Sequence, residues 1–597
     1  MTKAELGSLL AQCQAAELIR QVQAEPELEY WFRHALVQEA AYESLLKSTR
    51  AELHGRVAAA IEESVSDRTE ASAAVLALHY ERAGLDAKAY PYAVMAADRA
   101  RKTYAHREAV AFYDMALAIA ERSSDPEMLR QARAIYVHRG RVLEVSGDHP
   151  GAEANYRAML DSARRSGNLA MQADALNHLL TVQIVGGGRA PDLAPNLDEA
   201  ATLAQQSGEP ILEGRALWNM GLYHRFRNPS AAIEHLQGTL ELARSADPED
   251  IPMAELAANA LIDLSVSYIV GGQFRRAFAS RQQAVTAYRS LDNPSLLADA
   301  LGGLALISYF LGDTGQSRAY AEEGAKISES IDNPWGVVYS SWPLLEMEID
   351  AGKFESALAK SARHLELART VGFPVFRGIA LGLIARIRLE LGQAELAKEM
   401  AGQASEALEM MGVESWTTWG KAVAGTARLA AGDIAGARAS FEPMWRPGDD
   451  PVNALQGLMV AGPGIAAWSA LDGRLEHGLA FCDWLLGHEE AEGAWRFAGE
   501  MLYQRGMILN QLGDPQQAEA DLQRARELLE HAKVPILMWR ADAALAELFT
   551  KAGQDEQAAT AHRRARDGIE RLAGSIRDDA LRQSFLSRPD VRRLLDG

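Results

Sequence analysis

Apolar residues in the second half of the chain recur in a repeating frame that a glycine marks. The eight turn glycines, most of which follow a small residue or leucine, are Gly272, Gly312, Gly352, Gly392, Gly432, Gly473, Gly513 and Gly553. Their numbers differ by 40 and once by 41. A small side chain stands five residues after each one: Ala277, Ser317, Ala357, Ala397, Ala437, Gly478, Ala518 and Ala558. This pattern predicts a helix on each side of every turn glycine.

The repeating frame has a direct structural interpretation. A glycine, which lacks Cβ, ends a helix in a conformation that other residues avoid. Small residues on the flanking helices let two antiparallel helices approach closely, and large apolar residues such as Leu264, Leu304 and Ile384 fill the space beside them. A second break between repeats contains proline, in the segments Leu291–Pro294, Ile331–Pro334, Gly372–Pro374 and Lys533–Pro535.

A single helix pair cannot bury its apolar faces, so pairs stack on their neighbours. We therefore predict an all-α fold, a right-handed superhelical solenoid of antiparallel helix pairs with a period of about 40 residues. We expect about 12 pairs between residues 66 and 575.

The frame is less regular in several places. His106–Arg122 predicts the second helix of an earlier pair, and Gly187 and Asn228 mark degenerate repeats. Pro443–Pro451 and Ala461–Gly464 break the rhythm, either as a local bend of the superhelix or through simple drift.

Charge and cysteine content argue against several classes of protein, although a local basic patch remains compatible with the overall charge. The chain has 61 Lys and Arg against 81 Asp and Glu, a formal net charge of −20. This balance argues against non-specific binding to nucleic acid or to anionic membranes, which need positive charge. The two cysteines, Cys13 and Cys482, form no CxxC pair, which argues against a disulfide framework or a structural zinc site. No signal-peptide core and no apolar run of roughly 20 residues occur, so we expect a cytoplasmic protein.

The sequence offers little catalytic chemistry. The 14 histidines are scattered, and neither an HExxH zinc motif nor a GxSxG nucleophile turn is present. We expect no catalytic residues, no cofactor and no metal, and hence a binding protein rather than an enzyme.

Candidate binding residues follow from the repeat register. Positions 13, 10 and 6 before each turn glycine should face the inner, concave wall of the solenoid. The candidates at these positions are Tyr339, Trp342, Glu346, Arg386, Trp419, Glu500, Tyr503 and Arg540. Aromatic rings beside charges suit a protein or peptide partner, or a small polar ligand. The alternative is that several of these rings pack between repeats as ordinary core, and Trp335 and Trp416 fit either class.

Two resemblances add to this interpretation. The glycine turn followed by a small residue resembles the tetratricopeptide repeat, although its period is longer than the usual one of about 34 residues. The long period is similar to that of the sensor arms of bacterial signal-transduction ATPases with numerous domains, a group that includes maltose-regulator-type activators. Tyr30–Glu63 resembles the segment after the ATPase core of ATPases attached to class III nucleotide cyclases, where a winged-helix element leads into repeats. Ser575–Leu595 is similar to the C-terminal cap of that family.

The resemblance implies a domain organisation and a partner. Residues 1–65 would be a helical remnant of a winged-helix and linker region, and residues 576–597 a capping helix. The sequence contains no phosphate-binding GxxxxGK[ST] loop and no strand-rich segment that could be a cyclase, so a P-loop ATPase or cyclase partner would supply the nucleotide chemistry. His34 would then lie near a nucleotide phosphate, or else be a packed polar residue at a helix start. The alternatives are the inducer-binding arm of a transcription regulator and a free-standing scaffold.

Overall fold

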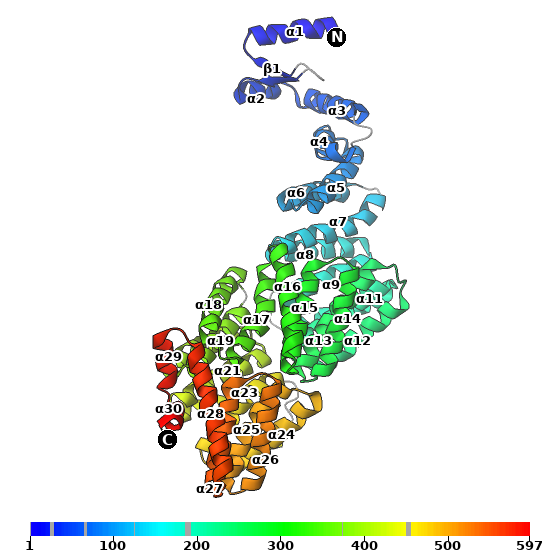
Figure 1. Ribbon diagram of the computed structural model, residues 1–597. Coiled ribbons are helices and arrows are strands. Elements are labelled where there is room, and N and C mark those ends of the chain that lie inside the picture. Colours follow the sequence, from blue (N-terminus) through cyan, green and yellow to red (C-terminus); the bar gives the residue numbers. More distant parts are fainter. Residues whose placement is uncertain are drawn as a thin grey trace. The chain divides into compact units, whose positions relative to one another are not determined.

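The computed structural model describes residues 2–23, 29–64, 69–123, 126–185, 193–372, 374–448 and 455–596. Contacts divide the chain into two compact units, Met1–Gly186 and Gly187–Gly597. The described residues are almost entirely helical (Figure 1). The prediction of an all-α solenoid of antiparallel helix pairs is therefore confirmed.

The elements of the first unit are α1 (Lys3–Ala15), β1 (Ile19–Gln23), β2 (Glu29–Phe32), α2 (Ala35–Glu43), α3 (Lys47–Ser64), α4 (Thr69–Arg82), α5 (Asp86–Lys102), α6 (His106–Arg122), α7 (Pro126–Val145), α8 (His149–Ser166) and α9 (Leu169–Val185). The segment predicted as helical, residues 1–65, thus contains two strands. They pair antiparallel, with Ile19 opposite Phe32 and Arg20 opposite Trp31. Aromatic and β-branched residues favour extended backbone, which explains the difference. The strands are too short to give a clear alternating pattern.

The elements of the second unit are α10 (Ala194–Ser207), α11 (Pro210–His224), α12 (Pro229–Ser245), α13 (Ile251–Val270), α14 (Phe274–Ser290), α15 (Pro294–Phe310), α16 (Thr314–Ser330), α17 (Pro334–Asp350), α18 (Phe354–Val371), α19 (Pro374–Glu390), α20 (Ala394–Glu409), α21 (Glu414–Ala430), α22 (Ile434–Phe441), α23 (Leu455–Leu471), α24 (Leu475–Glu492), α25 (Trp495–Leu512), α26 (Pro515–His531), α27 (Pro535–Lys551), α28 (Asp555–Ser575), α29 (Asp579–Leu586) and α30 (Pro589–Asp596). Residues 576–597, predicted to form one capping helix, contain two short helices, α29 and α30.

Local signals in the sequence set these helix boundaries. All eight turn glycines have a positive φ, between 69° and 86°. After α15, for example, the N–H of Asp313 donates to the carbonyl of Ser308 at 2.9 Å, which closes the end of the helix. The next break uses asparagine before proline: the side chain of Asn293 accepts from the N–H of Leu296, and Pro294 is the first helical residue.

The irregular stretches differ in their structures. Helix α22 ends at Phe441 after eight residues, so the stretch Pro443–Pro451 follows a shortened second helix; residues 449–451 lie outside the described residues. Ala461–Gly464, in contrast, lies inside the continuous helix α23, with Pro463 within it. Asn228 caps the start of α12, whereas Gly187 lies outside the described residues.

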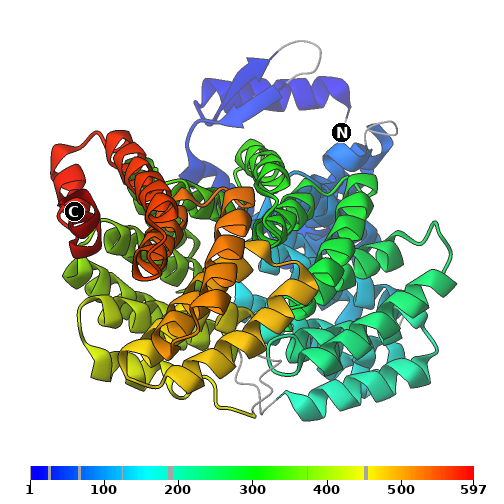
Figure 2. The same cartoon turned by 60° about the horizontal axis from the view of Figure 1, so that its bottom comes forward.

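The second unit folds back on itself. Helix α13 contacts α23, α15 contacts α25, and α17 contacts α27, so each first helix of a pair meets a helix ten elements later. The C-terminal helices lie beside the end of α19: the Ser584 hydroxyl donates to the carbonyl of Leu391 at 2.7 Å (Figure 2). We call the surface where the segment from α13 to α19 meets the segment from α23 to α30 the seam. Helix α13 is also the one described helix long and apolar enough to span a bilayer, and it is mostly buried in the unit.

Candidate functional site

The charged residues predicted for the concave wall lie at the seam or beside it, where they pair with other residues of the unit. Arg386 donates to Glu346 and to Asp350. Asp350 is 2% exposed and also accepts from Arg496, with Nη2 3.1 Å from Oδ1 and Nε 3.2 Å from Oδ2. Because Arg496 belongs to α25 and Asp350 to α17, this cluster joins two successive turns of the solenoid.

Tyr309 and Glu500 complete the cluster. The Tyr309 hydroxyl donates to Asp350 Oδ2 at 2.8 Å, and Arg496 Nη1 donates to Glu500 Oε2 at 2.6 Å. Burial alone would raise the pKa of Asp350, but Arg496 and Arg386 outweigh burial and lower it to about 2. Beside Glu500 the carboxyl of Glu489 is fully buried, and burial raises its pKa well above its usual range.

A second charged cluster lies near the end of α19. Glu390 accepts from Arg540 Nη2 at 2.7 Å and from Arg588 Nη1 at 3.2 Å. Burial would raise the pKa of Glu390, but the two guanidinium groups outweigh burial and lower it. Arg588 also donates to Asp590 at 2.6 Å. This second cluster joins α19 to α27 and to the segment between α29 and α30.

The seam also satisfies helix ends, which otherwise leave carbonyl groups without partners. The Ser575 hydroxyl donates to the carbonyl of Gly352 at 3.3 Å, and Arg275 Nε donates to the carbonyl of Glu492 at 3.1 Å. Apolar contacts accompany these bonds, such as the Phe310 and Phe497 rings, whose centroids are 5.4 Å apart. The seam therefore has the mixed polar and apolar character of a permanent interface.

The predicted aromatic residues pack as core. Trp342 and Trp419 are 4% and 7% exposed. The Trp419 ring occupies the space beside Gly382, where a Cβ atom would lie 2.5 Å from the ring. Tyr339 packs against Trp335, with centroids 5.2 Å apart, and Tyr503 is partly buried near Arg540. The alternative interpretation, that rings at these positions fill the space between repeats, thus describes their placement.

Sequence reasoning missed the residues at the centre of both clusters. Asp350 and Glu390 stand two residues before their turn glycines, where other repeats have Val270 and Phe310. This position is not apolar in every other repeat, because Gln511 and Lys551 also occupy it, so the two carboxylates gave only a weak signal. Arg496 and Arg588 gave no such signal, because their partners are more than a hundred residues away in the sequence.

His34 is exposed and stands at the start of α2, where its side chain forms no capping hydrogen bond. It is therefore at a helix start, as expected, but it is not packed. Among the described residues no group of three or more His, Cys, Asp or Glu is arranged to hold a metal ion.

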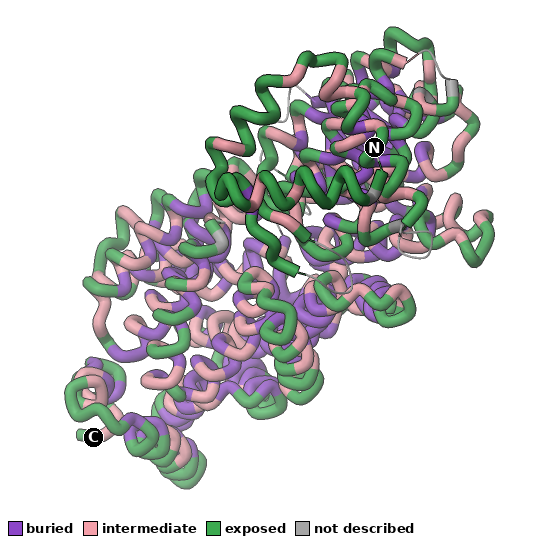
Figure 3. The backbone as a smooth tube through the Cα atoms, turned by 90° about the horizontal axis from the view of Figure 1, so that it is seen from above, coloured by how far each residue is buried: buried purple, intermediate pink, exposed green. Residues whose placement is uncertain are grey.

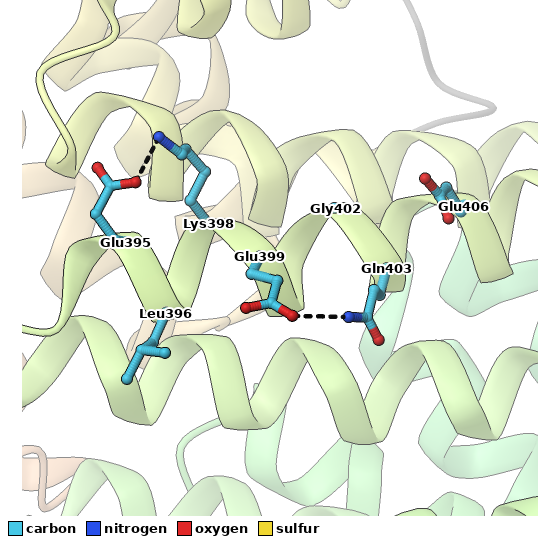
Figure 4. Close-up of a pocket in the computed structure, with 7 residues that line it drawn as sticks. All are labelled: Glu395, Leu396, Lys398, Glu399, Gly402, Gln403 and Glu406. Atoms are coloured by element: carbon cyan, nitrogen blue, oxygen red, sulfur yellow. Dashed lines mark hydrogen bonds and ion pairs between the residues drawn. The ribbon is translucent and has the colours of Figure 1, made fainter.

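A shallow depression lies on the outer surface of α20, and its lining residues are Glu395, Leu396, Lys398, Glu399, Gly402, Gln403 and Glu406 (Figure 4). All of them belong to this one helix, and they pair among themselves: Lys398 with Glu395 at 2.7 Å, and Gln403 with Glu399 at 3.4 Å. An open surface of this kind does not enclose a ligand.

Buried His364 gives a testable pH dependence. It is 3% exposed, its Nδ1 lies 3.3 Å from the Ser341 hydroxyl, and burial lowers its pKa from 6.5 to about 4. Between these values the unfolded chain binds the proton and the folded chain does not, so stability falls as the pH drops below 6.5. We expect His364→Gln to remove about 2 kcal/mol of the stability change between pH 6.5 and pH 5, measured by urea unfolding. His531→Gln, at an exposed histidine, should leave that change intact; equal pH profiles for both variants would contradict the assignment.

Residues 499–528, in α25 and α26, match the model of the tetratricopeptide repeat. No curated protein matches the chain. Similar solved structures include the APC/C hetero-tetramer Cut9–Hcn1, with 13% identity, 85% of this chain and 95% of that chain covered, and a TM-score of 0.40. The Rap protein complexed with competence and sporulation factor has 14% identity, with 66% and 99% covered and a TM-score of 0.33. The apo form of RapI has 11% identity, with 60% and 98% covered and a TM-score of 0.38.

Proposed function

We propose that the chain is a non-catalytic, cytoplasmic binding module that acts as the sensor arm of a nucleotide-dependent signalling ATPase or cyclase. Its repeats form a scaffold that suits protein–protein interaction, because each helix pair extends one surface. The resemblance of Tyr30–Glu63 and Ser575–Leu595 to the two ends of such an arm supports this choice of partner. The partner chain supplies the nucleotide chemistry.

The observation that carries the proposal is the outer face of α3, the last helix before the predicted repeat array. Leu46, just before it, is 75% exposed, and Leu53 and Val57 on α3 are 40% and 41% exposed. Leu53 and Val57 are four residues apart and so share one face of the helix. Terminal repeats of a solenoid need a polar outer face to stay soluble. An apolar stripe here suits a face that a partner covers, and His34 on the preceding segment would then face the partner's nucleotide.

The residues predicted to bind a ligand on the inner wall are already engaged in contacts within the protein. Arg386, Glu500 and Arg540 already have partners within the unit. A peptide or small polar ligand of this wall therefore has to compete with these ion pairs.

The test is a binding assay between the purified chain and the P-loop ATPases and cyclases encoded in the same genome. We expect one of them to bind, and its nucleotide turnover to change. Leu53→Asp with Val57→Asp should abolish that binding, because two carboxylates then replace the apolar stripe. Leu396→Asp, at a 48% exposed position on the outer surface of α20, is the matched control and should bind as the unchanged chain does. If none of these enzymes binds, the sensor-arm proposal is wrong, and the free-standing scaffold is favoured.

A further inference from the structure

The two-stranded sheet β1–β2 exposes an unusually apolar edge. Among the described residues from 2 to 46 only Ile19 is buried. Trp31 is 52% exposed and Phe32 44% exposed, and exposed positions (green) cover most of α1 (Figure 3). Two strands alone are marginally stable in water. An exposed apolar edge strand is a template for pairing with another strand.

The backbone groups that remain free on β2 can be identified. The N–H of Arg33 donates to the carbonyl of Leu18 at 3.0 Å, and Trp31 stands opposite Arg20. Hydrogen-bonded pairs alternate in an antiparallel ladder, so Arg33 and Trp31 bond toward β1. The N–H and C=O groups of Tyr30 and Phe32 therefore point to the opposite edge of β2, and no backbone hydrogen bond of the described residues outside the sheet uses them.

The strand carries opposite charges at equal distances on the two sides of its central residue. Glu29, Tyr30, Trp31, Phe32 and Arg33 place an acid and a base at equal distances from Trp31. If two such strands pair antiparallel about Trp31, Tyr30 of each copy stands opposite Phe32 of the other, and these are the residues whose backbone groups are free. Glu29 of each copy then stands opposite Arg33 of the other, so each dimer contains two attractive charge pairs.

Within one copy, Glu29 and Arg33 form only exposed contacts, which a second copy could replace. Trp31 Nε1 donates to Glu29 Oε1 at 2.7 Å, and Arg33 pairs with Glu17 at 3.4 Å, with side chains 45% and 75% exposed. Within one copy Glu29 and Arg33 are about 13 Å apart along the strand, too far to pair with each other.

We propose that β2 pairs with β2 of a second copy of this chain, so that two sheets join into one of four strands around a twofold axis at Trp31. Addition of a strand to an open edge supplies main-chain hydrogen bonds, and the charge pairs set the register. The two apolar edges then cover each other. This contact is separate from the α3 face, so the dimer and the binding of an ATPase or cyclase are independent.

A charge exchange tests the register. Sedimentation velocity of the full chain between about 1 and 200 µM should show a dimer, and Glu29→Lys or Arg33→Glu alone should weaken it about tenfold, because each creates two like-charge contacts. The double variant with both changes should return the dissociation constant to within about threefold of the original. Charges on one copy are too far apart to produce such rescue, so rescue reports pairing between copies. A monomer at every concentration, a dimer that the single changes leave unaltered, or failure of rescue would each overturn the proposal.

A cross-link provides an independent measurement. Trp31→Cys in a Cys13→Ser background places two thiols at a pair without hydrogen bonds, where Cα atoms are about 4.5 Å apart and a disulfide fits. Oxidation should give a covalent dimer. Glu29→Cys is the matched control, because its two copies would be about 13 Å apart and should remain monomeric on a denaturing gel. Cys482 is buried and stays out of the reaction. Cross-linking of the control as efficiently as of Trp31→Cys would contradict the register.

Discussion

Replacement of Arg496 by methionine should lower the free energy of unfolding of the second unit by about 3–5 kcal/mol, the typical result of removing one partner of a buried ion pair. Arg496 is 4% exposed and donates to Asp350 and Glu500. Its loss leaves Asp350 buried with only Arg386 to offset its charge. Methionine keeps most of the apolar stem of the side chain, so the loss reports the charge rather than the packing.

Urea unfolding followed by circular dichroism measures this effect. Arg318→Met is the control, because Arg318 pairs with Glu322 at 3.8 Å with both side chains at least half exposed. Such a pair contributes at most about 1 kcal/mol. Asp350→Asn combined with Arg496→Met should be less destabilising than the sum of the two single changes, since removal of both charges leaves no isolated buried carboxylate. Additive effects, or equal losses for Arg318 and Arg496, would show that the seam is not held by this cluster.

The fold was predictable from the sequence because its signals are local. Gly312 ends one helix through its own backbone conformation, and Asn293 with Pro294 begins the next. Each signal acts within a few residues, and the repeat multiplies it. The strands β1 and β2 were not predicted, because they occur once and span only five and four residues, so no repeat reinforces their local signals.

The seam was not predictable by the same means. Small rotations between neighbouring pairs accumulate along the solenoid, and their sum decides whether a later turn meets an earlier one. That sum brings α25 against α15 and α17, although no single repeat encodes it. A charged residue on the inner wall therefore has the same sequence signature whether it awaits a ligand or, like Arg386, already has its partner in Asp350. The repeat register predicted which residues lie on the inner wall, but it did not show whether they contact a ligand or other residues of the protein.

A turn glycine at the seam meets a steric requirement that a turn glycine elsewhere does not. Gly352 and Gly432 have nearly the same backbone conformation, with φ of 74° and 79°. A Cβ on Gly432 would meet no atom within 4 Å, whereas a Cβ on Gly352 would lie 2.2 Å from Leu572 Cδ2 across the seam. Gly432 therefore serves the conformation alone, and Gly352 serves both the conformation and the close approach of two turns.

We expect Gly432→Ala to cost about 1–2 kcal/mol of stability through backbone strain, and Gly352→Ala about 3–4 kcal/mol because overpacking adds to the same strain. Urea unfolding of both variants provides the comparison. In a Leu572→Ala background the excess cost of Gly352→Ala should disappear, since the atom that it meets is then absent. Equal costs for the two glycines, or an excess that persists without the Leu572 side chain, would mean that the strain lies within the turn. The excess therefore measures how tightly the seam constrains α17.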